Sequence, residues 1–224
     1  MDKQIDFKEL GKQIRCHDEI PAKGAKNNTS HPDNIMIFKS IESLELLTDV
    51  KVLEISFGNA KHLPFLFQKA KGICYYGIDT SEALVKKALS NNTLKAKEGR
   101  ARFIKVKEDG VLDFHNDFFD CCFTANTLYF WENPILHFTE IHRVLRPGGN
   151  FILAFIEKNN GGKLPWTQPD FTFYEVNEVK KIFQKTGFVN IEVKQMAGEI
   201  ISKDGQEITK PFVIMSGQKQ IGLN

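Results

Sequence analysis

Apolar positions from residue 50 onward follow two alternating patterns. Continuous short apolar runs, typical of strands buried on both faces, cover residues 51–55, 73–78, 102–106, 119–124 and 151–156. Apolar residues at helical spacing lie between some of these runs, over residues 61–70, 81–90 and 133–145. This alternation predicts an α/β fold with a doubly wound, mostly parallel sheet and right-handed crossovers.

The two ends of the chain depart from this rhythm. A short helix over 4–15 and a polar loop over 16–33 precede a second helix, whose first turn suits Pro32. We therefore expect an N-terminal helical segment, residues 1–48, added to a domain formed by residues 49–224. The two parts would make one structural domain, which a chain of 224 residues suits.

The pattern in the C-terminal third of the chain predicts a loop, a helix and the last two strands of the sheet. A glycine- and proline-containing loop, residues 158–172, precedes a helix over 175–186 that ends at Gly187. Two closing strands, near 188–195 and 210–216, bring the predicted sheet to seven strands. After the helix at 133–145, the run Arg146-Pro147-Gly148-Gly149 predicts a stop and a turn before the next strand.

Charge, apolar runs and cysteine spacing limit the kinds of partner that we expect for the protein. The net charge is +2, with basic and acidic residues interspersed, so we expect no nucleic-acid partner. No apolar run is long enough to span a membrane, and the first ten residues do not resemble a signal peptide. The four cysteines show no C-x-x-C spacing, as is typical of buried thiols in a reducing cytoplasm, and no metal site can be read from the sequence.

The most informative stretch is a turn of small residues after the first strand. That strand ends with Glu54-Ile55, and small residues follow at alternate positions, Ser56, Gly58 and Ala60. The second strand also ends in an acid, Asp79. Ligands of doubly wound sheets bind outside the carboxyl ends of the strands, so two acids there favour a ligand with hydroxyl or ammonium groups.

A nicotinamide-dependent oxidoreductase fits this turn poorly. The dinucleotide fingerprint requires G-x-G-x-x-G, whereas the spacing here is Ser56-x-Gly58-x-Ala60 with a lysine at position 61. An acid directly before the turn would also face a pyrophosphate unfavourably. A nucleoside that carries an amino acid fits better, because its ammonium group would be attracted to an acid.

These residues and four further motifs, in this order, resemble the class I S-adenosylmethionine-dependent methyltransferases. The resemblance covers about residues 50–157 and is closest to the small-molecule group that includes the ubiquinone and menaquinone biosynthesis enzymes (type 11). The closing helix and strand pair also fits this family, whose last strand is antiparallel to the rest. The further motifs are Glu108-Asp109-Gly110 with Leu112-Asp113-Phe114, Phe119-Asp120 with Asn126, Trp131-Glu132-Asn133-Pro134 and Leu145-Arg146-Pro147-Gly148-Gly149.

The resemblance implies S-adenosylmethionine as the cofactor and assigns residues to it. Asp79 would accept hydrogen bonds from both ribose hydroxyls, since a carboxylate suits a cis-diol. Glu108 or Asp109 would lie near the adenine amino group, and Asn126 would lie beside the methyl donor. The full set of expected cofactor-binding residues is Glu54, Ser56, Phe57, Gly58, Asp79, Thr80, Glu108, Asp109 and Asn126.

The implied activity is transfer of a methyl group to a small-molecule acceptor by in-line attack. No catalytic base can be named, and the acceptor and the oligomeric state stay open. Because Ser56 replaces a family glycine, the alternative is a degenerate protein that binds adenosylmethionine or a partner without turnover. We expect the acceptor pocket to be built from added loops, residues 16–36, 126–131 and 158–172.

Overall fold

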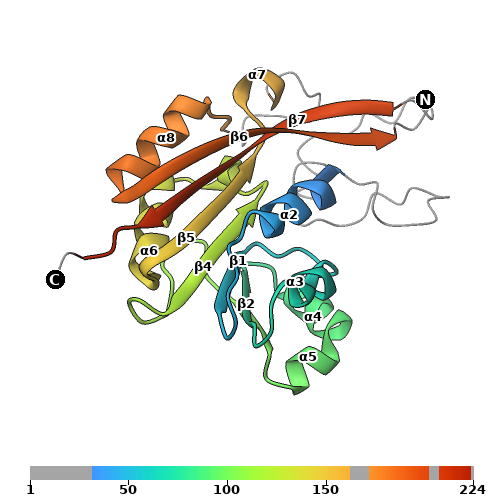
Figure 1. Cartoon of the computed structure of the whole chain (residues 1–224). Helices are drawn as coiled ribbons and strands as arrows, with labels where there is room; N and C mark the ends of the chain where they lie inside the picture. The colour runs from blue at the N-terminus through green and yellow to red at the C-terminus, as the bar shows by residue number, and fades with distance from the viewer. Residues whose placement is uncertain (1–31, 162–171, 202–206, 223–224) are drawn as a thin grey trace.

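The computed structural model describes residues 32–161, 172–201 and 207–222. It contains a seven-stranded sheet with the strand order β3-β2-β1-β4-β5-β7-β6 (Figure 1). The strands are β1 (Lys51–Ile55), β2 (Cys74–Asp79), β3 (Ala101–Lys105), β4 (Phe119–Ala125), β5 (Leu145–Phe155), β6 (Phe188–Ile201) and β7 (Glu207–Lys219). The predicted helix over 4–15 lies outside the described residues.

The directions of the strands confirm the doubly wound fold. Strands β1 to β5 pair in parallel, whereas β7 pairs antiparallel with both β5 and β6. The chain proceeds from β1 through β2 to β3 on one side and then returns to place β4 on the other side of β1. Strand β1 is therefore central, and every residue from Val52 to Ile55 is buried.

Helices cover both faces of the sheet (Figure 1). The elements are α2 (Pro32–Glu42), α3 (Leu63–Lys69), α4 (Glu82–Asn91), α5 (Thr93–Lys97), η1 (Leu128–Phe130), α6 (Pro134–Val144), α7 (Lys158–Gly161) and α8 (Val176–Lys185). Helices α2, α3 and α4 pack on one face, and α6 and α8 pack on the other. The fold thus has three layers with one core on each side of the sheet.

Local sequence signals explain where several helices begin. Pro32 opens α2, as expected. Ser81 caps α4, where its side chain accepts a hydrogen bond from the Leu84 N–H group at 3.4 Å. Glu175 and Glu178 form a capping box at the start of α8.

The structure differs from the predicted elements in several places. Helix α7 lies within residues 158–172, which were expected to form a loop. The expected turn at residues 146–149 lies within β5, which begins at Leu145; Gly148 has a φ of 81°, and the register with β4 shifts there. The short helix α5 was not predicted. The closing strands β6 and β7 are longer than expected, and they extend past the end of β5 as a two-stranded arm (Figure 1).

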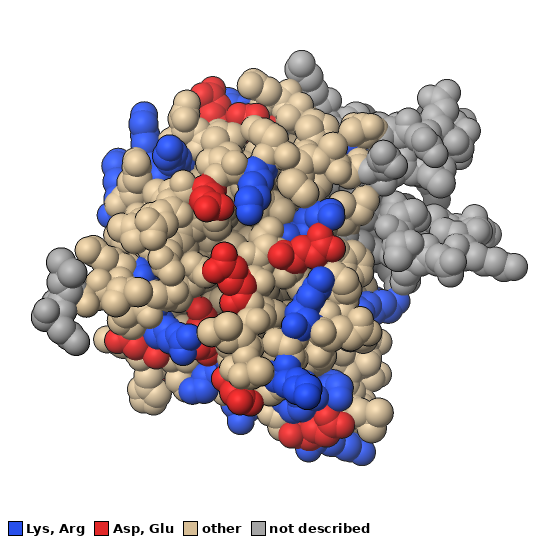
Figure 2. All heavy atoms as spheres, viewed as in Figure 1, with Lys and Arg blue, Asp and Glu red and all other residues tan. Residues whose placement is uncertain are grey.

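Charged side chains are mixed on the surface. Figure 2 shows basic and acidic side chains interspersed over the face in view, in keeping with a chain of 30 basic and 28 acidic residues. Within the described ranges, no helix combines the length and the apolar character that a membrane crossing would require.

The core beneath α6 and α8 should carry much of the stability. Phe138 is fully buried, and its ring lies 5.2 Å from that of Phe151 and 4.9 Å from that of Phe183. We expect Phe138→Ala to lower the free energy of unfolding by about 3–5 kcal/mol, because it leaves a cavity among these rings. The control is Leu94→Ala, because Leu94 is 74% exposed. It should change the free energy of unfolding by less than about 0.5 kcal/mol in the same denaturant titration.

Candidate functional site

The candidate site lies at the edge of the sheet where the parallel strands end. Strands β1, β2 and β4 finish at Ile55, Asp79 and Ala125, and parallel neighbours place these carboxyl ends at the same edge. The connections after β1 and β4 leave the sheet on opposite sides of this point. Such a switch point is where doubly wound sheets bind their ligands.

The turn after β1 has three residues in the left-handed region. Ser56, Gly58 and Ala60 have φ values of 60°, 58° and 51°. Only glycine adopts this region without strain, so Ser56 and Ala60 each carry a cost of about 1–2 kcal/mol. The Ser56 N–H group donates to the Ile78 carbonyl oxygen at 2.8 Å, which ties the start of the turn to the end of β2.

Two asparagines at the end of α4 hold the turn from below. The Asn91 side chain donates to the Asn59 carbonyl oxygen at 2.9 Å, and the Asn92 side chain donates to that of Ala60 at 3.1 Å. Among the described residues, no group accepts from the N–H groups of Gly58 and Asn59. The sequence indicates only a polar stretch at 91–92, and its role depends on the contact between α4 and the turn.

Glu54 lies beneath the turn, inside the core. The residue is 2% exposed, and its Oε2 atom lies 2.8 Å from His62 Nε2. The same oxygen accepts a hydrogen bond from the Tyr75 hydroxyl at 2.5 Å. Burial and the Glu54 carboxylate raise the pKa of Tyr75 well above its usual value, so the phenol keeps its proton and donates. Sequence reasoning missed both partners, which come from two other elements.

Asp79 is a second buried acid at this edge. It is 6% exposed and ends β2, and its Oδ1 atom accepts from the Ser81 N–H group at 2.8 Å. Thr80 follows it at an exposed position. The backbone of Asp79 also accepts from the Val106 N–H group at 2.9 Å, which joins the ends of β2 and β3.

The acidic pair after β3 is exposed. Both Glu108 and Asp109 are accessible to solvent, and Asp109 Oδ1 accepts from the Val111 N–H group at 3.1 Å. Gly110 is buried and has a φ of 77°, and a side chain there would meet the His137 ring within about 2.9 Å. The loop is therefore fixed against α6, with its acids on the outer side.

Asn126 occupies a left-handed turn at the end of β4, with a φ of 59°. Its N–H group donates to the Ala154 carbonyl oxygen at 3.0 Å, and its side-chain oxygen accepts from the Tyr129 hydroxyl at 3.3 Å. That hydroxyl also accepts from the Ile156 N–H group. Tyr129 thus joins the ends of β4 and β5. Asn126, which was expected beside the methyl donor, lies at this junction.

Further elements border this edge on the side of β5. The Phe173 ring lies 4.8 Å from the Tyr129 ring, and Tyr129 and Trp131 are buried whereas Phe130 is partly exposed. The arm of β6 and β7 packs against α2, where Gly198 approaches the Ile35 side chain. The other segments expected to form an acceptor pocket, residues 16–31 and 162–171, lie outside the described residues.

Comparisons with known proteins show the family of the chain. Residues 53–153 match the family described as the methyltransferase domain. An uncharacterized protein of Methanocaldococcus jannaschii is 30% identical over 203 residues, which are 84% of this chain and 92% of that protein. The chain belongs to the class I S-adenosylmethionine-dependent methyltransferases, in the type 11 group.

Two further comparisons concern a curated methyltransferase and a solved structure. Phosphoethanolamine N-methyltransferase 2 of Caenorhabditis elegans is 25% identical over 130 residues, which are 56% of this chain but only 29% of that protein. The putative methyltransferase in a complex with the Haloferax volcanii Trm112 methyltransferase activator superposes with a TM-score of 0.71. It is 19% identical, over 84% of this chain and 90% of that one, so this likeness concerns the fold.

The strain at Ser56 gives a testable prediction for this methyltransferase. We expect Ser56→Gly to raise the free energy of unfolding by roughly 0.5–1 kcal/mol, because glycine adopts a positive φ without a Cβ clash. The matched control is Ser90→Gly, at an exposed helical position of α4. This change should lower the free energy of unfolding. A loss of stability in Ser56→Gly, measured by denaturant titration, would contradict the strain.

Proposed function

We propose that the protein transfers a methyl group from S-adenosylmethionine to a small-molecule acceptor. Membership of the methyltransferase family supports the reaction class. Two features at the switch point carry the proposal. In the turn at 56–60, the N–H groups of Gly58 and Asn59 have no acceptor among the described residues. Beside the turn lies the buried carboxylate of Asp79. Bound there, the cofactor supplies an electrophilic methyl group on a sulfonium.

The residues present fit this cofactor. The Asp79 carboxylate would accept hydrogen bonds from the ribose hydroxyls, and the Gly58 and Asn59 N–H groups would donate to the amino-acid carboxylate. Thr80 would border the nucleoside, and Glu108 or Asp109 would accept from the adenine amino group. Phe57 is 1% exposed and its ring packs against that of Phe103, so only its backbone would face the ligand. Ser56, Gly58 and Asn126 would bring the backbone of two strand ends close to the ligand.

The role of the protein in the transfer is positioning and exclusion of water. An acceptor held in line with the methyl group needs little further assistance, and a base is needed only when the nucleophile must lose a proton. The ends of β4 and β5, joined through Tyr129, would form one wall of the acceptor pocket. The arm of β6 and β7 with α2 would form another, and we name no catalytic residue.

The alternative of a degenerate binding protein is less well supported than turnover. Two features of the sequence suggested this alternative, Ser56 and the absence of a visible base. Ser56 adopts the left-handed conformation that the family's glycine would supply, with its N–H group bonded to β2. The family match favours an active enzyme. We further propose a cytoplasmic location, because the cysteine spacing favours it.

Calorimetric titration tests the proposal. We expect binding of S-adenosylmethionine and S-adenosylhomocysteine at micromolar concentration, and no binding of NAD. Formation of S-adenosylhomocysteine with a panel of small amine, hydroxyl and thiol acceptors then separates turnover from binding alone. No binding of either adenosyl ligand would refute the proposed function.

The ribose assignment predicts the effect of one variant. Asp79→Asn keeps the shape of the side chain and an acceptor for the Ser81 N–H group, but it removes the negative charge. We expect its affinity for S-adenosylhomocysteine to fall roughly 10- to 150-fold, the scale of about 1.5–3 kcal/mol for hydrogen bonds to charged groups. Asp113→Asn, an exposed acid nearby in the sequence, should bind as the wild type does.

A further inference from the structure

Glu54 and His62 join the two ends of the turn. Glu54 is the penultimate residue of β1, and His62 is the N-cap residue directly before α3. Their side chains meet at 2.8 Å between Glu54 Oε2 and His62 Nε2, with His62 only 7% exposed. This contact closes residues 55–61, which include the whole turn, into a loop fixed at both ends.

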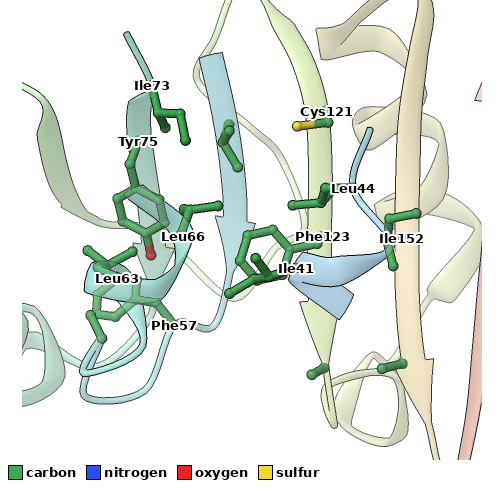
Figure 3. Packing of buried hydrophobic residues seen from close by; sticks show 14 of the residues in the cluster. Ile41, Leu44, Phe57, Leu63, Leu66, Ile73, Tyr75, Cys121, Phe123 and Ile152 are labelled. Atoms are coloured by element: carbon green, nitrogen blue, oxygen red, sulfur yellow. The ribbon is translucent and has the colours of Figure 1, made fainter. Parts of the chain in front are cut away.

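Tyr75 holds the same carboxylate oxygen from the neighbouring strand. Its hydroxyl donates to Glu54 Oε2, and the residue is 1% exposed. Figure 3 shows its ring beneath Leu63 and Leu66 of α3, with the hydroxyl oxygen directed into the core. Gly77 makes this placement possible, because a Cβ there would lie 2.6 Å from the Tyr75 hydroxyl oxygen.

The surroundings of Glu54 hold its side chain in the core. A buried carboxylate must be hydrogen-bonded, since its burial without partners would cost far more than one hydrogen bond returns. His62 Nε2 and the Tyr75 hydroxyl both meet Glu54 Oε2, which fixes this oxygen between the start of α3 and β2. To turn this oxygen elsewhere, Glu54 would have to lose both contacts.

We propose that Glu54, His62 and Tyr75 are positioning residues that hold the turn at 56–60 in its ligand-binding shape. Glu54 acts on the cofactor through the turn. The turn needs such support because two of its non-glycine residues are in the left-handed region. This inference rests on the proposed function, since its ligand is the adenosyl cofactor.

Binding measurements on hydrogen-bond variants test the proposal. Tyr75→Phe and His62→Leu each remove one donor to Glu54, and neither residue would touch the ligand. We expect each to weaken the binding of S-adenosylhomocysteine about tenfold, the scale of one lost hydrogen bond. His62→Gln, whose side-chain amide can still donate, should restore most of the affinity.

A stability control separates positioning from general destabilisation. Ile141→Val removes one methyl group from the core on the other face of the sheet. It should lower the melting temperature yet leave the affinity unchanged. Wild-type affinity in both Tyr75→Phe and His62→Leu, or losses no larger than in Ile141→Val, would overturn the proposal. A wild-type protein that binds neither adenosyl ligand would instead overturn the proposed function, and this inference with it.

Discussion

The parallel pairing of β1 with both β2 and β4 is the constraint on which the candidate site depends. It places three strand ends at one edge, and it buries β1 on every side. The turn after β1 must then leave the sheet sharply, which requires left-handed backbone at Ser56 and Ala60. The side chains of Asn91 and Asn92 bind the carbonyl groups of this turn, so the helix after β2 supports the turn after β1.

The same burial determines the chemistry of Glu54. An acid in the middle of a three-layer fold is tolerated only with donors in reach, and His62 and Tyr75 supply them from α3 and β2. Asp79 differs, because it ends its strand beside the exposed Thr80. The two acids that look equivalent in the sequence therefore have different proposed roles: Glu54 supports the turn, and Asp79 meets the ribose.

The alternation of apolar runs predicted the fold because buried parallel strands have a strong and continuous signal. Boundaries were harder to predict where conformation depends on pairing: Leu145 to Gly149 looks like a turn, but β4 pairs with part of it through a shifted register. The positions of Glu54, Gly58, Asp79 and Asn126 at one edge follow from the strand order. The contacts of Glu54 could not be predicted, because they join residues 8 and 21 positions apart on three elements. Gly77 pairs with Glu54 between β1 and β2, and its lack of a side chain leaves room for the Tyr75 hydroxyl. This glycine was the signal in the sequence that could have indicated the contacts of Glu54.

A crystal structure of the protein with S-adenosylhomocysteine would test the proposed site most directly. We expect the ribose at Asp79, the amino-acid part of the ligand over the turn at Ser56–Ala60, and the Glu54 carboxylate still bonded to His62 and Tyr75. Ligand density away from the ends of β1 and β2 would contradict the site. A Glu54 side chain turned out of the core to meet the ammonium group would contradict the role proposed for it.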